Sequence, residues 1–122
     1  MGINVFVHDD SVDIGFTGLD RLVTLRGRVH LPMGTIADAR LARRDDLRSQ
    51  IGLRLGGTYI PGVVAAGCFS IRDRKGAEQI WDVYRDTEVL LIETKLEHPA
   101  RVVLQHPDRE RLAWLVAERI DR

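Results

Sequence analysis

The feature that most limits the fold of this chain is a series of short β-like segments that ends in one amphipathic helix. Residues 11–17 (SVDIGFT) alternate between apolar and polar or small side chains, which is the period-2 pattern of a half-buried strand. The β-rich residues 4–8 come before it. Residues 9–11 (DDS) between the two segments are typical of a turn, so the pattern predicts a hairpin.

Short β-like segments recur along the rest of the chain. Residues 18–27 are ambiguous, and we interpret them as a helical turn, whereas the charged residues 43–52 indicate an exposed connection. Further short strands, spaced at roughly 8–12 residues, are typical of an antiparallel sandwich or barrel. These are predicted over residues 28–31 (ending at Pro32), 35–42, 67–73, 79–86, 87–95 and 101–106, with turns at 74–77 and 96–100.

The last segment, residues 106–122, has the pattern of an amphipathic helix. Pro107 suits the first helical position, and the apolar side chains after it recur at helical spacing. That stripe consists of Leu112, Ala113, Val116, Ala117 and Ile120. The sequence therefore predicts a single mainly β domain over residues 1–122. We expect about seven antiparallel strands in a partly open barrel, which the C-terminal helix caps.

Residues 53–67 (LRLGGTYIPGVVAAG) contain two overlapping Gly-x-x-x-x-Gly spacings. A phosphate-binding loop needs Lys and Ser/Thr directly after its second glycine. Here Val63 follows Gly62 and Cys68 follows Gly67, so the groups that hold a nucleotide are missing. The glycines instead indicate positive φ angles or close strand approach, with a turn at Pro61 and Gly62.

These residues also carry a family resemblance. Residues 52–71, the Trp81-Asp82-Val83 strand, the 29–36 segment and the C-terminal helix together resemble bacterial pleckstrin-homology-like (PH-like) domain proteins. The resemblance spans residues 3–121, with Leu31 inserted before Pro32. It implies a PH-like fold and a binding or scaffold domain, and it supplies no catalytic residues and no cofactor.

Composition excludes several classes of protein. The 18 Lys and Arg balance the 18 Asp and Glu, so no net field attracts nucleic acid. The single cysteine, Cys68, cannot form an internal disulfide, and no Cys/His spacing suggests a zinc site. The start of the sequence does not resemble a signal peptide, and its apolar runs are too short to span a bilayer. We expect a cytoplasmic protein without metal or cofactor.

Two groups of arginines form a candidate anion site. Arg40, Arg43 and Arg44 lie in one charged segment, and Arg72, Arg74 and Lys75 lie in another. Guanidinium groups bind phosphate in a bidentate manner, so two such loops on one rim could hold a phosphorylated headgroup or an acidic peptide. Interleaved aspartates leave the alternative that both segments are ordinary solvated loops.

Catalysis has little support in the sequence. The four histidines are scattered, and the strand-like context of Cys68 predicts a buried, inert thiol. Glu93 and Glu97 are too far apart on a strand to form an acid/base pair. The acidic residues 8–13 match a calcium loop poorly, and a hairpin turn explains them.

Trp114 is the candidate interface residue. A rotation of 100° per residue turns it away from the apolar stripe of the terminal helix, which would place it at a partner or self-association contact. The alternative, slightly favoured, is that a broad barrel mouth buries the ring as well.

Together these observations predict a non-enzymatic binding or assembly module. We expect its partner to be a protein, a peptide or a second copy rather than a small molecule, held by addition to a sheet edge. The alternative is anion or phospholipid-headgroup binding through the six basic residues, with peripheral contact to lipid.

Overall fold

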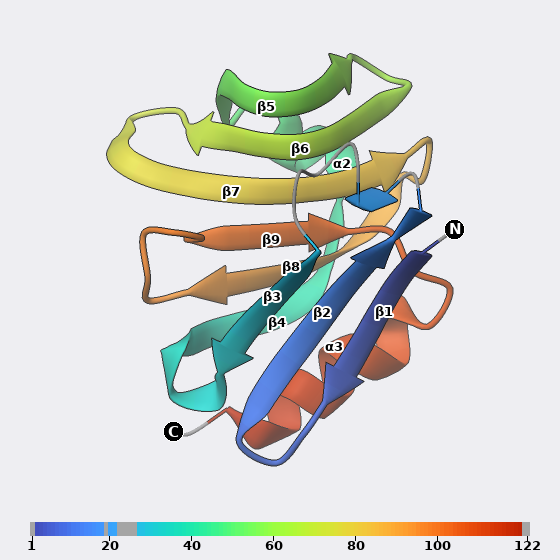
Figure 1. Ribbon diagram of the computed structural model, residues 1–122, viewed down its shortest axis with the longest axis vertical. Coiled ribbons are helices and arrows are strands. Elements are labelled where there is room, and N and C mark those ends of the chain that lie inside the picture. Colours follow the sequence, from blue (N-terminus) through green and yellow to red (C-terminus); the bar gives the residue numbers. More distant parts are fainter. Residues whose placement is uncertain (1, 19, 22–26, 121–122) are drawn as a thin grey trace.

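A computed structural model describes residues 2–18, 20–21 and 27–120, which form two β-sheets and a C-terminal helix (Figure 1). The three-stranded sheet contains β1 (Gly2–Val7), β2 (Ser11–Thr17) and β3 (Arg28–Pro32). The six-stranded sheet contains β4 (Ile36–Arg43), β5 (Ile51–Ile60), β6 (Val64–Ile71), β7 (Arg74–Tyr84), β8 (Glu88–Thr94) and β9 (Arg101–Leu104). The helical segments are η1 (Met33–Thr35), α2 (Arg44–Arg48) and α3 (Arg109–Arg119).

The strand order confirms part of the predicted architecture. The mainly β class with a C-terminal helix is confirmed, and so is the β1–β2 hairpin, with Val7 opposite Val12. The larger sheet has the order β4-β8-β9-β7-β6-β5 and is not closed, because β4 and β5 are its edges. The described residues form nine strands, not about seven, and β7 and β9 pair in parallel. The prediction of an antiparallel barrel was therefore wrong in these details.

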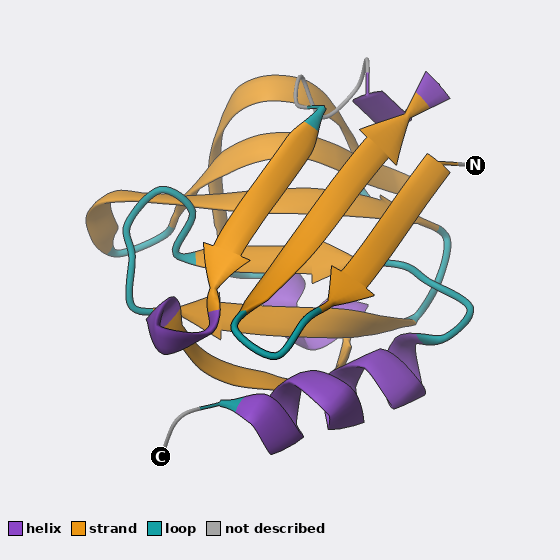
Figure 2. Cartoon of the chain, turned by 60° about the horizontal axis from the view of Figure 1, so that its bottom comes forward, coloured by secondary structure: helices purple, strands orange, loops and turns teal. Residues whose placement is uncertain are grey.

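The central strands of the six-stranded sheet are buried on both faces. Leu90 and Ile92 on β8 face the smaller sheet and α3, whereas Val89 and Leu91 on the same strand belong to a second apolar cluster. Figure 2 shows the smaller sheet in front of the larger one, with α3 along their lower edge. A strand covered on both sides needs apolar residues at consecutive positions, which explains the unbroken VLLI of β8.

Helix α3 begins later than the sequence indicates. Pro107 lies in a turn before the helix, where the Asp108 backbone N–H donates to His106 Nδ1 at 3.0 Å. Asp108 is the N-cap, so the prediction of Pro107 as the first helical residue was wrong. The predicted stripe is otherwise sound, because Leu112 and Val116 are buried against the sheets. None of the described helices is long and apolar enough to cross a membrane.

The predictions for the connections at residues 18–27 and 43–52 differ in outcome. Asp20 and Arg21 have helical backbone, in line with the predicted turn, and Gly18 before them has a φ of +59°, while residues 19 and 22–26 lie outside the described residues. The charged connection 43–52 contains the short helix α2, whose Leu47 is buried in the second apolar cluster. This segment is therefore not wholly exposed, because α2 covers part of the six-stranded sheet.

Two glycines confirm that the 53–67 segment is shaped by its backbone. Gly62 lies in the β5–β6 turn with φ of +77°, a region that side chains disfavour. Gly67 pairs with Gly57 across the hairpin, and a Cβ placed on Gly67 would lie 2.1 Å from the Gly56 carbonyl oxygen. Only glycine lets β5 and β6 approach this closely.

The close approach at Gly67 gives a test of the fold. Replacing Gly67 with alanine forces β5 away from β6, so we expect the free energy of unfolding to fall by about 2–3 kcal/mol. Gly15→Ala is the matched control, because Gly15 also lies in a strand and no atom would approach its Cβ within 4 Å. The control should stay within about 0.5 kcal/mol of wild type in urea denaturation. Equal effects of the two substitutions would contradict this explanation.

Candidate functional site

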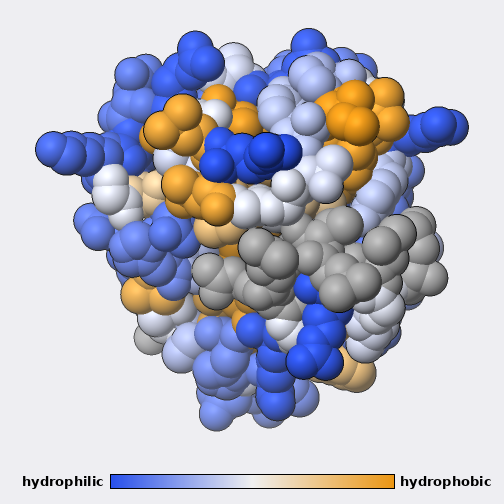
Figure 3. Space-filling model, turned by 45° about the horizontal axis from the view of Figure 1, so that its top comes forward, coloured by the Kyte–Doolittle hydropathy of each residue, from blue (hydrophilic) through white to orange (hydrophobic). Residues whose placement is uncertain are grey.

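Strand β5 is an edge strand that exposes apolar side chains. Leu53, Leu55 and Ile60 are 74%, 53% and 51% exposed, and no strand pairs with the outer edge of β5 among the described residues. The pairing with β6 shifts register on both sides of Arg54, so Leu53, Arg54 and Leu55 are all exposed rather than alternating. Figure 3 looks onto this end of the molecule, where exposed hydrophobic side chains lie among hydrophilic ones.

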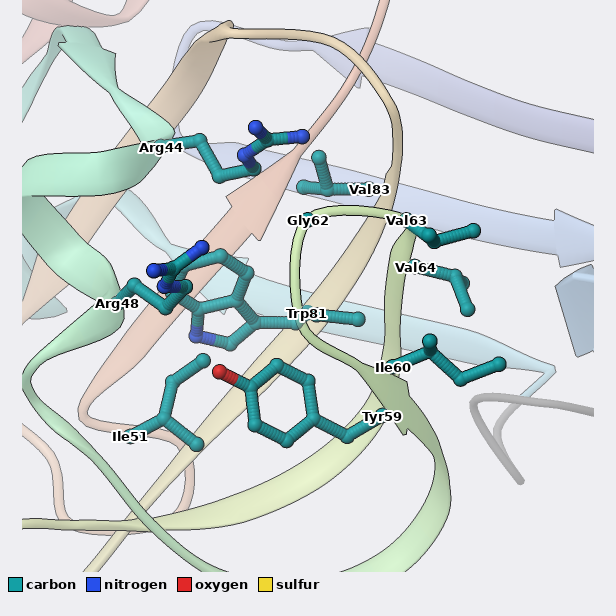
Figure 4. A pocket seen from close by; sticks show the side chains of 11 residues that line it. Arg44, Arg48, Ile51, Tyr59, Ile60, Gly62, Val63, Val64, Trp81 and Val83 are labelled. Carbon is teal, nitrogen blue, oxygen red and sulfur yellow. The ribbon is translucent and has the colours of Figure 1, made fainter.

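A narrow hollow of about 230 Å³, open to solvent, adjoins the end of β5 (Figure 4). It lies between α2, the β5–β6 hairpin and β7, at a place where the short helix α2 does not fully cover the second apolar cluster. Its lining is apolar apart from two arginines and the Tyr59 hydroxyl. The lining residues are Arg44, Arg48, Ile51, Tyr59, Ile60, Gly62, Val63, Val64, Ala65, Trp81 and Val83.

The floor of the hollow is held in place by side-chain contacts. Trp81 is fully buried, and its indole N–H donates to Gln79 Oε1 at 2.9 Å. The amide of Gln79 donates in turn to the carbonyl oxygens of Gln50 and Ser70, both at 3.0 Å. Because the buried Gln79 is satisfied at both ends, it fixes the orientation of the indole ring.

Two arginines form the rim of the hollow. Arg44 and Arg48 are one turn apart on α2 and therefore lie on the same side of it. The Arg44 side chain is only 14% exposed, and its Nε lies 3.3 Å from Oδ1 of the exposed Asp45. Arg48 makes no ion pair within the described part of the chain. The hollow thus combines an apolar floor with a positive rim.

Basic side chains also lie at the other end of β5. Arg72, Arg74 and Lys75 line a second, open hollow at the β6–β7 turn, together with Leu53. These three side chains, with Arg54 on the strand itself, are exposed and form no ion pair among the described residues. Asp73 is the acidic residue between them. The surroundings of β5 are therefore positive, although the whole chain has no formal net charge.

The predicted anion-binding residues do not line one hollow. Arg44 lines the hollow beside α2, whereas Arg72, Arg74 and Lys75 line the one at the β6–β7 turn. Arg40 pairs with Asp38 at 2.8 Å, and the exposed Arg43 lines neither hollow. Anion binding by these residues stays a prediction. Arg48, which belongs to the same predicted basic segment but is not one of the six predicted site residues, lines the same hollow as Arg44 because of its spacing on α2.

Trp114 is exposed, so the slightly favoured prediction of burial was wrong. It is 62% exposed and borders a shallow hollow with Pro107, Asp108, Glu110 and Arg111. The reason is helical geometry, because Leu112, Ala113 and Val116 turn their common side toward the sheets and leave position 114 outside.

The residues considered for catalysis lie in separate ion-pair networks. Asp13 contacts both His30 Nδ1, at 2.7 Å, and His8 Nε2, at 3.2 Å, on the outer side of the smaller sheet. The hydrogen bond from His30, with help from Arg28, holds the pKa of Asp13 below its usual value although burial opposes this. The described residues contain no group of three acidic, His or Cys side chains placed to bind a metal.

Cys68 and Glu93 also differ from the predictions made for them. Cys68 is only partly buried, and its thiol donates to Glu78 Oε2 at 3.3 Å, so it is not the fully buried thiol expected. Glu93 forms a short ion pair with the buried Arg101, which also donates to Gln50. Glu93 is therefore held in a contact between β8 and β9.

Sequence reasoning missed a buried carboxyl pair, Asp20 and Asp82. Both are almost fully buried, and the backbone N–H of Gly2 donates to Asp20 Oδ2 at 2.7 Å. Burial, together with the hydrogen bond to Asp20 and its charge, raises the pKa of Asp82 to about 9. Burial and the same two carboxyls raise the pKa of Tyr84 to about 12. Asp82 is therefore protonated at neutral pH and can donate a hydrogen bond.

The carboxyl pair predicts an unusual dependence of stability on pH. Asp82 loses its proton near pH 4 when unfolded but near pH 9 when folded, so the folded state becomes less stable as pH rises between these values. Asp82→Asn cannot ionise and removes this loss. Relative to wild type, we expect the variant to gain up to about 4 kcal/mol between about pH 5 and about pH 8, measured by urea denaturation. Parallel pH profiles of the two proteins would contradict the assignment.

No family profile, no curated protein and no solved structure matches this chain. The resemblance to PH-like domains therefore stays a prediction, and the fold class stands on the two sheets and the helix described above.

Proposed function

We propose that this chain is a non-enzymatic binding module that holds an extended segment of a partner protein as an added strand on β5. The observation that carries the proposal is the unpaired outer edge of β5 together with its exposed Leu53, Leu55 and Ile60. The resemblance to bacterial PH-like domains, which implies a binding or scaffold domain, agrees with this proposal, as does the expected cytoplasmic location.

Strand addition suits β5 because this edge lacks most of the features that keep natural edge strands from pairing with other strands. Natural edge strands are protected by short length, proline, inward charges, β-bulges or a covering element, since unpaired backbone groups attract other strands. β5 has one of these devices, the irregular pairing with β6 on both sides of Arg54. β5 is ten residues long, has no proline and carries one charged residue, Arg54. The main chain would supply most of the affinity, and the exposed apolar side chains would select the partner.

The charges around β5 favour an acidic, apolar partner segment over a second copy of this chain. Arg54 projects from the strand itself, and Arg72, Arg74 and Lys75 border Leu53. Two copies that paired their β5 strands around Arg54 would bring like charges together, which is destabilising across strands. An acidic segment meets the same charges with attraction and gains from faster association.

The alternative function, anion or phospholipid-headgroup binding, has weaker support. Its six residues divide between two hollows and two positions that line neither. The group at the β6–β7 turn could still attract a phosphate, but Asp73 lies within it. We therefore favour the protein segment as the ligand.

Substitutions on β5 test the proposal. Decapeptides are selected on the wild-type protein from a random library fused at both ends, and their dissociation constants are measured by fluorescence anisotropy. We expect Leu53→Ser combined with Leu55→Ser to weaken binding at least about tenfold, because both apolar contacts are lost. Both side chains are exposed, so the fold should be little affected.

Leu96→Ser is the matched control for this experiment, because Leu96 is also exposed but lies in the β8–β9 connection. It should leave the dissociation constant unchanged. Selected peptides that bind equally well to the β5 double variant, or a selection that yields no binder, would refute strand addition at β5.

Trp114 gives a separate test of self-association. Because the charges at β5 oppose pairing between copies, we expect the same sedimentation coefficient at low and high micromolar concentrations. Trp114→Ala should change neither this coefficient nor peptide binding. A concentration-dependent increase that Trp114→Ala abolishes would instead assign self-association to α3.

A further inference from the structure

We infer that the hollow beside α2 binds the C-terminal residue of the partner segment, with the carboxylate on Arg44 and Arg48 and an apolar side chain over Tyr59 and Val63. This inference rests on the proposed function, because it names the end of the segment that lies along β5. It names the chemical class of ligand for this hollow, which strand addition alone does not require.

The positive charge at the rim of the hollow favours an anionic ligand. The Arg44 side chain is mostly buried, and a buried cation is costly unless it is paired. Its contact in the described chain is a 3.3 Å approach of Nε to Asp45, which leaves the two terminal nitrogens to the hollow. Arg48 lies beside it without an ion pair. Figure 4 shows both side chains reaching from α2 toward the hollow.

The size and lining of the hollow limit the ligand. The space that a water-sized group can enter is about 10 Å³, or about one water molecule, so a ligand rests across the mouth of the hollow instead of filling it. Its walls include Ile60, Val63 and Val64, which favour an aliphatic side chain over a polar one. A carboxylate next to one apolar side chain matches this combination of an apolar lining and a positive rim.

The surrounding charges favour a carboxylate over a phosphate. Asp45 and Asp46 lie on α2 directly beside the two arginines, and both are exposed. They reduce the positive potential at the rim, which makes a dianion less favourable than a monoanion. Arginine pairs with carboxylates in the planar, bidentate geometry that a chain terminus offers.

The hollow is continuous with the edge that holds the strand. Tyr59 and Ile60 are the last residues of β5, and both line the hollow. A segment that runs along the outer edge of β5 therefore reaches the hollow where β5 ends. Capture of a terminal carboxylate at the end of an added strand fixes the register of that strand, which main-chain pairing alone leaves open.

The test uses the smallest probe that carries both groups, N-acetyl-leucine. Its binding is followed by the NMR signals of the Trp81 indole N–H and of the 60–64 amides, with Trp114→Phe used to assign the two indole signals. We expect these signals to shift. N-acetyl-leucinamide, which lacks the charge, should bind at least about tenfold more weakly. N-acetylglycine, which lacks the side chain, should also bind more weakly.

Arginine variants locate the carboxylate. Arg44→Gln and Arg48→Gln should each weaken N-acetyl-leucine binding about tenfold, whereas the matched control Arg43→Gln should have no effect, because Arg43 does not line the hollow. Unchanged NMR signals away from the hollow show that each variant is folded. The exposed Arg48 keeps the test decisive if Arg44→Gln is unstable.

Three results would overturn the inference. These are equal binding of the acid and its amide, an equal loss in Arg43→Gln, and unshifted Trp81 and 60–64 signals at the highest soluble concentration. Inorganic phosphate that displaces N-acetyl-leucine at equal concentration would overturn the choice of a carboxylate. Tighter binding of free 4-methylpentanoate, which lacks the amide, would replace the chain terminus with a small carboxylic acid.

Failure of this inference can be told apart from failure of the proposed function. If internal decapeptides bind and depend on Leu53 and Leu55, but a free C-terminus adds nothing over an amidated one, strand addition stands and terminal capture is refuted. If no internal peptide binds while N-acetyl-leucine still requires Arg44 and Arg48, the hollow is a ligand site without strand addition.

Discussion

The burial of the six-stranded sheet on both faces is the constraint on which the rest of this structure depends. β8 and β9 are interior strands of that sheet, and their apolar residues belong to the two larger apolar clusters of the core. One face is covered by the three-stranded sheet and α3. The other is covered by α2 and by the curl of β5 and β6, so each peripheral element has a defined place to pack.

The candidate site follows from how unevenly the second face is covered. α2 is five residues long, and its Leu47 reaches the cluster while its two arginines stay at the rim. The β5–β6 hairpin completes the cover but remains an edge, and its glycines keep the hairpin tightly paired. A longer helix would close the hollow, and a further strand beyond β5 would remove the edge. The surface proposed for binding is thus the part of the second face that α2 and the β5–β6 hairpin do not fully cover.

The sequence predicted elements where the signal was local, and it failed where the outcome depended on distant neighbours. The strand β2 and the turn at Pro61 and Gly62 depend on residues close in the chain, and both are confirmed. In β5, simple alternation would put Leu53 and Leu55 on the side opposite Arg54, but the register shifts around Arg54 expose all three. Such bulges come from pairing with β6 and leave no clear local signal.

The positions of Asp82 and of the arginines also depend on distant neighbours and could not be predicted from the local sequence. A charged residue beside Trp81 in a strand would normally face water, yet Asp82 is buried because the six-stranded sheet is covered on both sides. Arg44 and Arg72 carry the same chemistry in similar charged segments, but the fold places them in different hollows. The sequence correctly indicated that these segments are basic, but which of the arginines lie in the same hollow depends on the topology of the fold.

The strand order also has a consequence for how the chain is made. β4 and the β5–β6–β7 meander are synthesised early, but they lie on opposite sides of β8 and β9, which come from residues 88–104. During translation, the two halves of the larger sheet are thus joined by α2 alone, each with an open edge, until most of the polypeptide has left the ribosome. β8 and β9, which join the two parts of the sheet, are the last strands to be made, so a nascent chain that is not shielded exposes aggregation-prone edges until they emerge.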